Sequence, residues 1–130
     1  MWNGITVFDK FEKSSVDAPE QSIENLTTLK VKGGNWRDED VTKRPTDPQG
    51  LARSILHVLA NKGAVNVNSV GNVALNITMK AYRIAKMEVA SRTTETTLVI
   101  DQTEYKAVVN GKPAKGLCTR IFPIPRKDLV

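Results

Sequence analysis

Residues 47–89 decide the fold, and they read "DPQGLARSILHVLANKGAVNVNSVGNVALNITMKAYRIAKMEV". The first part has the local signals of a helix, since Asp47 is a suitable N-cap, Pro48 fits the first turn and Gly63 can end the helix. Apolar residues recur on one face at helical spacing: Leu51, Ala52, Ile55, Leu56 and Leu59. We therefore predict a helix between Asp47 and Gly63 that buries this face.

A strand and a second helix follow. The residues from Ala64 to Gly71 alternate between apolar and polar types, with Val65 and Val67 on one face, as in a half-buried strand. After Gly71 we predict a helix that runs to about Met87. Its apolar residues form two stripes on nearly opposite sides, Val73, Ala74, Ile77, Ala81, Ile84 and Ala85 on one and Leu75, Met79 and Tyr82 on the other.

The second stripe raises a question, because a helix in a small domain normally needs only one apolar stripe. In a monomer with the first stripe packed on a sheet, Leu75, Met79 and Tyr82 would be exposed. Either they form a self-association surface, or the N-terminal segment or the neighbouring helix covers them within one chain.

The flanking segments complete the fold. Leu26 to Lys32 predicts a strand ended by Gly33-Gly34, with Thr28, Lys30 and Lys32 on one face. The C-terminal part predicts a long strand from Thr96 to Val109, a turn at Asn110-Gly111 and a return strand from about Gly116 to Ile124. The order β-α-β-α-β-β predicts an α+β two-layer sandwich, a four-stranded mixed sheet with both helices on one face.

We divide the chain of 130 residues into three parts. Residues 1–25 are polar, lean acidic and are predicted to be an exposed N-terminal arm. Residues 26–127 are predicted to form one domain, and residues 128–130 a short tail. Between the first strand and the first helix, residues 33–46 form a long charged loop that contains Trp36.

Positive charge is concentrated in the second part of the chain. Residues 48–127 contain twelve Lys and Arg and four acidic residues, a balance of +8, whereas residues 1–47 have a balance of −2. Such a field attracts polyanions, of which nucleic acid is the commonest. With the single Cys118, no apolar run of 18 residues and no leader-like N-terminus, we expect a cytoplasmic protein that does not enter a membrane.

Catalytic groups are scarce in this sequence. His57 is the only histidine and lies in the first predicted helix, and Cys118 lies in a predicted strand. A metal site or a nucleophilic triad would need further partners for either residue. We therefore predict no enzymatic activity, no metal site and no cofactor.

The run from Gly50 to Ala90 resembles the stage V sporulation protein S family. A helix, a Gly-Ala step into a strand, a Val-Gly junction, "ALN" and a "KA…IA" helix occur in the order typical of that family. The resemblance extends from about Leu26 to Arg126, and its strongest part is residues 63–85. It implies an Alba-like fold, binding to DNA or RNA with weak sequence preference, and a dimer or higher homo-oligomer. It also favours Leu75, Met79 and Tyr82 as the dimer interface.

In the Alba-like arrangement the first loop and the terminal hairpin project to the same side of the dimer. The basic residues predicted to contact nucleic acid lie there: Lys30, Lys32, Arg37, Lys43, Arg44, Lys106, Lys112, Lys115 and Arg120. A regulatory or chromatin-type role follows from the resemblance. The alternative is an assembly regulator that does not bind nucleic acid, because the loop is longer than in the family and contains the acidic run Asp38, Glu39 and Asp40.

Overall fold

The computed structural model describes residues 27–129. Two α-helices and four β-strands form the domain, and two short 3-10 helices flank them: β1 Thr28–Lys30, η1 Val41–Lys43, α2 Pro48–Lys62, β2 Val65–Val70, α3 Asn72–Arg92, β3 Thr96–Val109, β4 Lys112–Pro125 and η2 Arg126–Leu129. The predicted arm, residues 1–25, lies outside the described residues. At the other end, η2 crosses the predicted boundary between residues 127 and 128.

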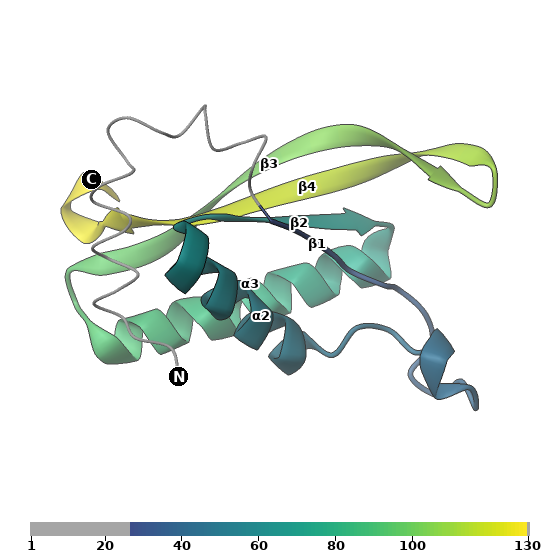
Figure 1. Cartoon of the computed structure of the whole chain (residues 1–130), viewed down its shortest axis with the longest axis horizontal. Coiled ribbons are helices and arrows are strands. Elements are labelled where there is room, and N and C mark those ends of the chain that lie inside the picture. The colour runs from purple at the N-terminus through teal and green to yellow at the C-terminus, as the bar shows by residue number, and fades with distance from the viewer. Residues whose placement is uncertain (1–26, 130) are drawn as a thin grey trace.

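The sheet has the order β1-β2-β4-β3. β1 and β2 are parallel, whereas β4 runs antiparallel to both β2 and β3. Both helices lie on one face of this sheet, and α3 passes under the long β3–β4 hairpin (Figure 1). The predicted α+β sandwich with a four-stranded mixed sheet is therefore confirmed.

α2 has the predicted boundaries because its ends are capped locally. The carboxylate of Asp47 accepts a hydrogen bond from the N–H of Gly50 at 3.0 Å, and the N–H of Gly63 donates to the carbonyl of Leu59 at 2.9 Å. The whole predicted apolar face is buried, and Val58 is buried with it. This face packs against α3 and β2.

α3 differs from the prediction in length and in the face that it buries. The helix ends at Arg92, beyond the predicted end near Met87. Val73 and Ile84, which we assigned to the buried stripe, are 45% and 37% exposed. The residues that are buried instead form one arc: Ala74, Ile77, Thr78, Ala81, Ala85 and Val89. Three alanines in this arc let the α3 backbone lie close to α2 and the sheet. The larger side chains at the edges of the arc lie at the rim of this contact and are only partly buried.

The hairpin is longer than predicted on its return strand. β4 begins at Lys112 directly after the turn, where we expected the strand to begin near Gly116. Asn110 and Gly111 both have positive φ, 52° and 77°, as a two-residue type I′ turn requires. Pro113 does not interrupt β4 because β2 pairs only with residues 116–121, so no ladder hydrogen bond to β2 is lost there.

β1 is shorter than the predicted strand of residues 26–32. It pairs with β2 only from Thr28 to Lys30, and the N–H of Val31 adds one further bond to the carbonyl of Asn68 at 3.0 Å. The N–H of Asn66 also donates to the carbonyl of Thr27 at 3.1 Å. Leu29 packs against the core and Val31 is buried in it, so apolar contacts add to the backbone hydrogen bonds of this short edge strand.

Candidate nucleic-acid interface

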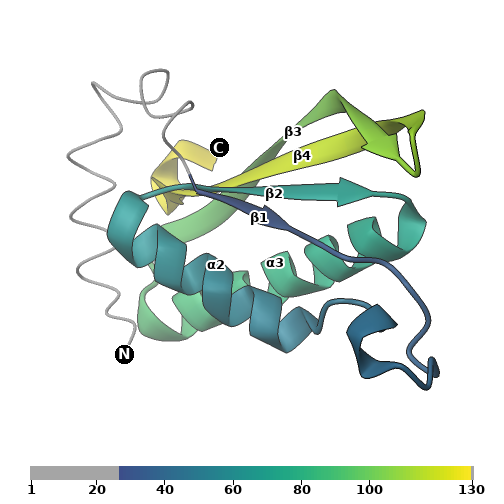
Figure 2. The same cartoon turned by 45° about the vertical axis from the view of Figure 1, so that its right-hand side comes forward.

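The loop between β1 and α2 and the turn of the β3–β4 hairpin lie at the same end of the molecule (Figures 1 and 2). The N-terminus of α3 lies at this end as well, below the hairpin (Figure 2). Most of the basic residues predicted from the sequence belong to these two projecting segments.

The loop is closed at its base by hydrogen bonds between Lys32 and Thr46. The N–H of Lys32 donates to the Thr46 hydroxyl at 2.8 Å, and the N–H of Thr46 donates to the Lys32 carbonyl at 2.9 Å. Within the loop, Gly34 has φ +148°, and a Cβ placed on it would lie 2.5 Å from the Lys43 carbonyl oxygen. The residues between Lys32 and Thr46 thus form a closed loop. At Gly34 its backbone passes so close to the backbone of Lys43 that a side chain would not fit.

Two of the three acidic residues of the loop shape its backbone. The Asp38 carboxylate accepts the N–H of Asp40 at 3.0 Å. Asp40 caps η1 and accepts both the hydroxyl of Thr42 at 2.6 Å and its N–H at 3.0 Å. These bonds, chiefly that from the hydroxyl, lower the pKa of the Asp40 carboxyl. The carboxylates that seemed unfavourable for phosphate binding therefore organise the turns that display the basic residues.

The basic residues of the loop are exposed. Arg44 donates from Nε to the carbonyl of Asp38 at 2.9 Å, so its guanidinium is held against the loop. Arg37 follows Asn35, whose side chain accepts the Arg37 N–H at 2.9 Å, and Lys43 lies in η1. Arg37, Lys43 and Arg44 therefore project from one ordered loop.

The hairpin has three lysines near its turn, two on one face and Lys112 on the other. Lys106 and Lys115 are directly opposite each other in the β3–β4 ladder, and Lys112 begins β4 just after the turn. Residues 105–116 contain these three lysines and no acidic residue. Only β3 and β4 form the ladder beyond Gly116, so four residue pairs project past the four-stranded sheet, roughly 13 Å at about 3.3 Å per residue.

Lys30 and Arg120 lie elsewhere. In the strand register they pair with Asn68 and Asn66, on the sheet face away from the helices. Asp101 lies directly opposite Arg120 on β3 and offsets its charge. The structure therefore brings Lys106, Lys112 and Lys115 together on the hairpin, leaving Lys30 and Arg120 on the body of the sheet.

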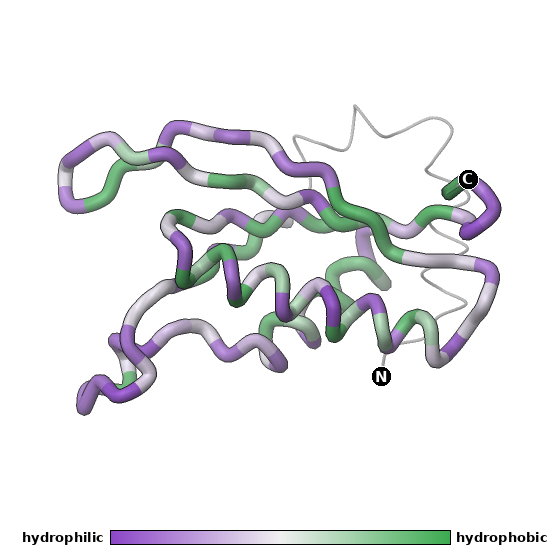
Figure 3. The backbone as a smooth tube through the Cα atoms, turned by 180° about the vertical axis from the view of Figure 1, so that it is seen from behind, coloured by the Kyte–Doolittle hydropathy of each residue, from purple (hydrophilic) through white to green (hydrophobic). Residues whose placement is uncertain are grey.

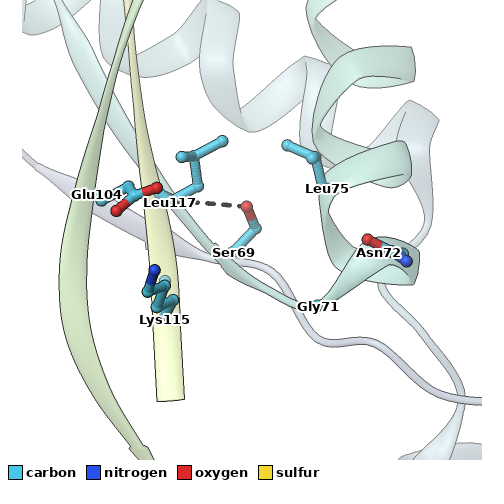
Figure 4. Close-up of a pocket in the computed structure, with 8 residues that line it drawn as sticks. Ser69, Gly71, Asn72, Leu75, Glu104, Lys115 and Leu117 are labelled. Atoms are coloured by element: carbon cyan, nitrogen blue, oxygen red, sulfur yellow. Dashed lines mark hydrogen bonds between the residues drawn. The ribbon is translucent and has the colours of Figure 1, made fainter.

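An open pocket of about 230 Å³ lies between the base of the hairpin and the start of α3. Figure 4 shows Glu104 and Lys115 on the hairpin side and Leu75 and Asn72 on the α3 side. Ser69 lies between them, and its hydroxyl donates to the Leu117 carbonyl at 3.4 Å. Lys115 is thus part of the pocket lining, together with the first turn of α3.

The second stripe of α3 contacts β3 of the same chain. The Tyr82 hydroxyl donates to the Leu98 carbonyl at 2.8 Å, and Gln102 donates from Nε2 to Met79 Sδ at 3.7 Å. Leu75, Met79 and Tyr82 are half-buried in the single chain. The first stripe, apart from Val73 and Ile84, thus lies within the buried arc, and the second stripe lies at the edge of that arc next to β3. The predicted dimer interface stays a prediction.

Sequence reasoning missed the apolar side chains at the projecting end. Val108 is 75% exposed and lies opposite Pro113 in the ladder, one step beyond the pair Lys106 and Lys115 on the same face. The signal was present in "KAVVNGKPAK", residues 106–115, because strand alternation around a two-residue turn fixes which side chains share a face.

The two groups considered for catalysis lie on different elements, His57 on α2 and Cys118 on β4. His57 is exposed on α2, where Asn61 Nδ2 lies 3.3 Å from its Nε2. Cys118 is half-buried, and burial raises the pKa of its thiol. Among residues 27–129, no three His, Cys, Asp or Glu side chains gather in a way that could hold a metal ion. In the same part of the chain, no helix combines the length and apolar character needed to cross a bilayer.

Comparison with known proteins gave no match for this chain, either among protein-family models or among curated proteins.

Proposed function

We propose that the protein is a non-enzymatic nucleic-acid-binding protein of Alba-like type that contacts the phosphates of DNA or RNA with weak sequence preference. The observation that carries the proposal is the position of the basic loop and the lysine-rich hairpin at one end of the molecule (Figure 2). We place it in the cytoplasm and assign it a regulatory or chromatin-type role resembling that of sporulation protein S.

The mechanism is electrostatic. Each lysine or arginine that neutralises a phosphate releases condensed counterions, so the logarithm of the affinity falls linearly with the logarithm of the salt concentration, by about 0.9 per phosphate contact. The exposed cations of the loop, Arg37, Lys43 and Arg44, and of the hairpin, Lys106, Lys112 and Lys115, supply these contacts. None of these side chains needs a particular base, which accounts for the weak sequence preference.

The test is a fluorescence titration against unrelated duplexes across a salt series. Replacing Lys112 and Lys115 by Glu should weaken binding to all duplexes by similar factors and reduce the salt slope by at least about 2. The matched control is the replacement of Lys62 and Lys127 by Glu, the same charge change in α2 and η2. An affinity that is absent at low salt, or equally weakened by the control, would contradict the proposal.

Self-association through α3 is part of the proposal. Leu75, Met79 and Tyr82 keep part of their apolar surface accessible at the edge of α3, and burying it in a dimer would contribute about 25 cal/mol per Å². Light scattering should show a dimer that Met79→Glu dissociates. Met87→Glu, a change at an exposed residue of the same helix, should leave the dimer intact. The reverse result would move the interface to the other edge of α3.

A second candidate function is an assembly regulator that binds another protein. The observation in its favour is the pair of exposed apolar side chains in the loop, Trp36 and Val41, beside the acidic Glu39. Purified protein that ignores DNA and RNA at low salt, yet forms a stoichiometric complex with a single partner protein, would establish this function instead.

A further inference from the structure

The tip of the hairpin has two distinct zones on one face. Lys106 and Lys115 form the inner pair, and Val108 and Pro113 form the next pair toward the turn. Beyond Val108, the turn residues Asn110 and Gly111 carry no charge. Figure 3 shows a short hydrophobic stretch directly beside the turn of the hairpin. Val108 and Pro113 are both exposed at the end of this cationic arm and are not buried by any of residues 27–129.

The structure of the β3–β4 hairpin fixes the position of its tip relative to the domain. The β3–β4 ladder is continuous from Thr96 and Pro125 to Val109 and Lys112, and a type I′ turn closes it. On the opposite face, the ring of Tyr105 lies so close to Gly116 that an added Cβ would overlap it. An aromatic ring that covers a glycine in a neighbouring strand stiffens the sheet at that point. The tip is therefore presented on a two-stranded arm supported at its base.

We propose that Val108 and Pro113 form an apolar wedge that inserts from the minor groove of duplex DNA between two base pairs and bends the duplex. The inference rests on the proposed function, because the lysines behind the wedge bring it to the DNA. Proteins that bend DNA from the minor groove insert apolar side chains, proline among them, and unstack one base step. Lys106 and Lys115, on the same face as the wedge, then lie where the phosphates that flank the groove would be, and Lys112 adds positive charge on the opposite face next to the turn.

The shape and chemistry of the hairpin tip favour the minor groove of duplex DNA as its binding site. A minor groove about 6 Å wide is narrower than a two-stranded ribbon, so entry requires the groove to open. Val108 and Pro113 have no side-chain hydrogen-bonding group, so they cannot read the donors and acceptors of the major groove. They can respond only to how easily a step unstacks, which makes pyrimidine–purine steps and mismatches the preferred sites. The wide, shallow minor groove of duplex RNA offers no such site.

The test uses full-length protein and duplex DNA of about 30 base pairs labelled at both ends for energy transfer. We expect bending of a duplex with a central mismatch, and roughly tenfold tighter binding to it than to a stiff A-tract of equal length. Replacing Val108 and Pro113 by Ser should abolish the bend and the preference while retaining the salt slope. Met87→Ser, a change at an exposed apolar residue of α3 outside the loop and the hairpin, is the matched control and should alter neither.

The outcomes separate the two proposals. Binding that keeps its salt slope but shows no bend, or a bend that survives loss of both wedge residues, overturns the wedge alone. An absence of binding at low salt overturns the proposed function and the wedge with it. Equal loss of affinity for duplex RNA on replacing Val108 and Pro113 also contradicts the wedge, since the RNA groove offers it no step to enter.

Discussion

Ile55 of α2 and Val108 of the hairpin are both β-branched apolar residues, yet Ile55 has no exposed surface and Val108 is 75% exposed. Around Ile55, side chains from both helices and the sheet form one core. Around Val108, only two strands and a turn are present. Burial of apolar surface holds the first region together, and short-range hydrogen bonds hold the hairpin tip and the loop. Replacing a buried side chain in the body should therefore alter stability, whereas replacing an exposed side chain at the projecting end should alter binding.

The largest expected effect is in the body. Ile55→Ala should lower the free energy of unfolding by about 2–5 kcal/mol, because it leaves a cavity in a fully buried site. Val108→Ala should change it by less than about 0.5 kcal/mol, as expected for an exposed side chain. Urea denaturation followed by circular dichroism measures both. Similar losses for the two variants would remove the distinction between the regions.

A smaller effect is expected inside the loop. Gly34→Ala should cost about 1–3 kcal/mol, because its φ of +148° disfavours a side chain and its Cβ would meet the Lys43 carbonyl. Gly33→Ala is the matched control, since its Cβ would have only ordinary contacts, the nearest at 3.7 Å. Denaturant unfolding should separate the two. A harmless Gly34→Ala would mean that the loop adjusts freely, and so is less ordered than its hydrogen bonds indicate.

The smallest effect concerns pH. The pKa of Asp40 is lowered below its ordinary value of 3.8, so the hydrogen bonds from Thr42 are complete above that pH and are lost as the pH falls through the lowered pKa. An NMR titration should show the Thr42 amide signal moving below pH 3.8. Thr42→Val removes the hydroxyl donor and should bring the Asp40 pKa back toward 3.8. An unchanged titration would show that the hydroxyl bond does not control the carboxyl.

Some residues of the candidate site could be located from the sequence and others could not. The lysines of the hairpin could be located from the sequence, because an Asn-Gly turn fixes the register and strand alternation fixes the faces. Arg120 could not be separated from them, since its distance from the turn matters only once β2 is known to pair with residues 116–121. The structural role of Asp38 and Asp40 could not be predicted either, because a run of acidic residues does not show which backbone N–H groups lie within hydrogen-bonding distance of their carboxylates.

Local sequence signals were enough to predict α2 with both of its ends, β2 with its alternating faces, and β3 with the turn that follows it. Each depends on caps, turn residues or periodicity that act over a few neighbouring positions. Contacts in the folded domain, by contrast, determine that the second stripe of α3 lies at the edge of one buried arc, that β4 begins at Lys112, and that the loop and the hairpin lie at one end. Those features arise from contacts between residues far apart in the chain, whose side chains compete for the same space.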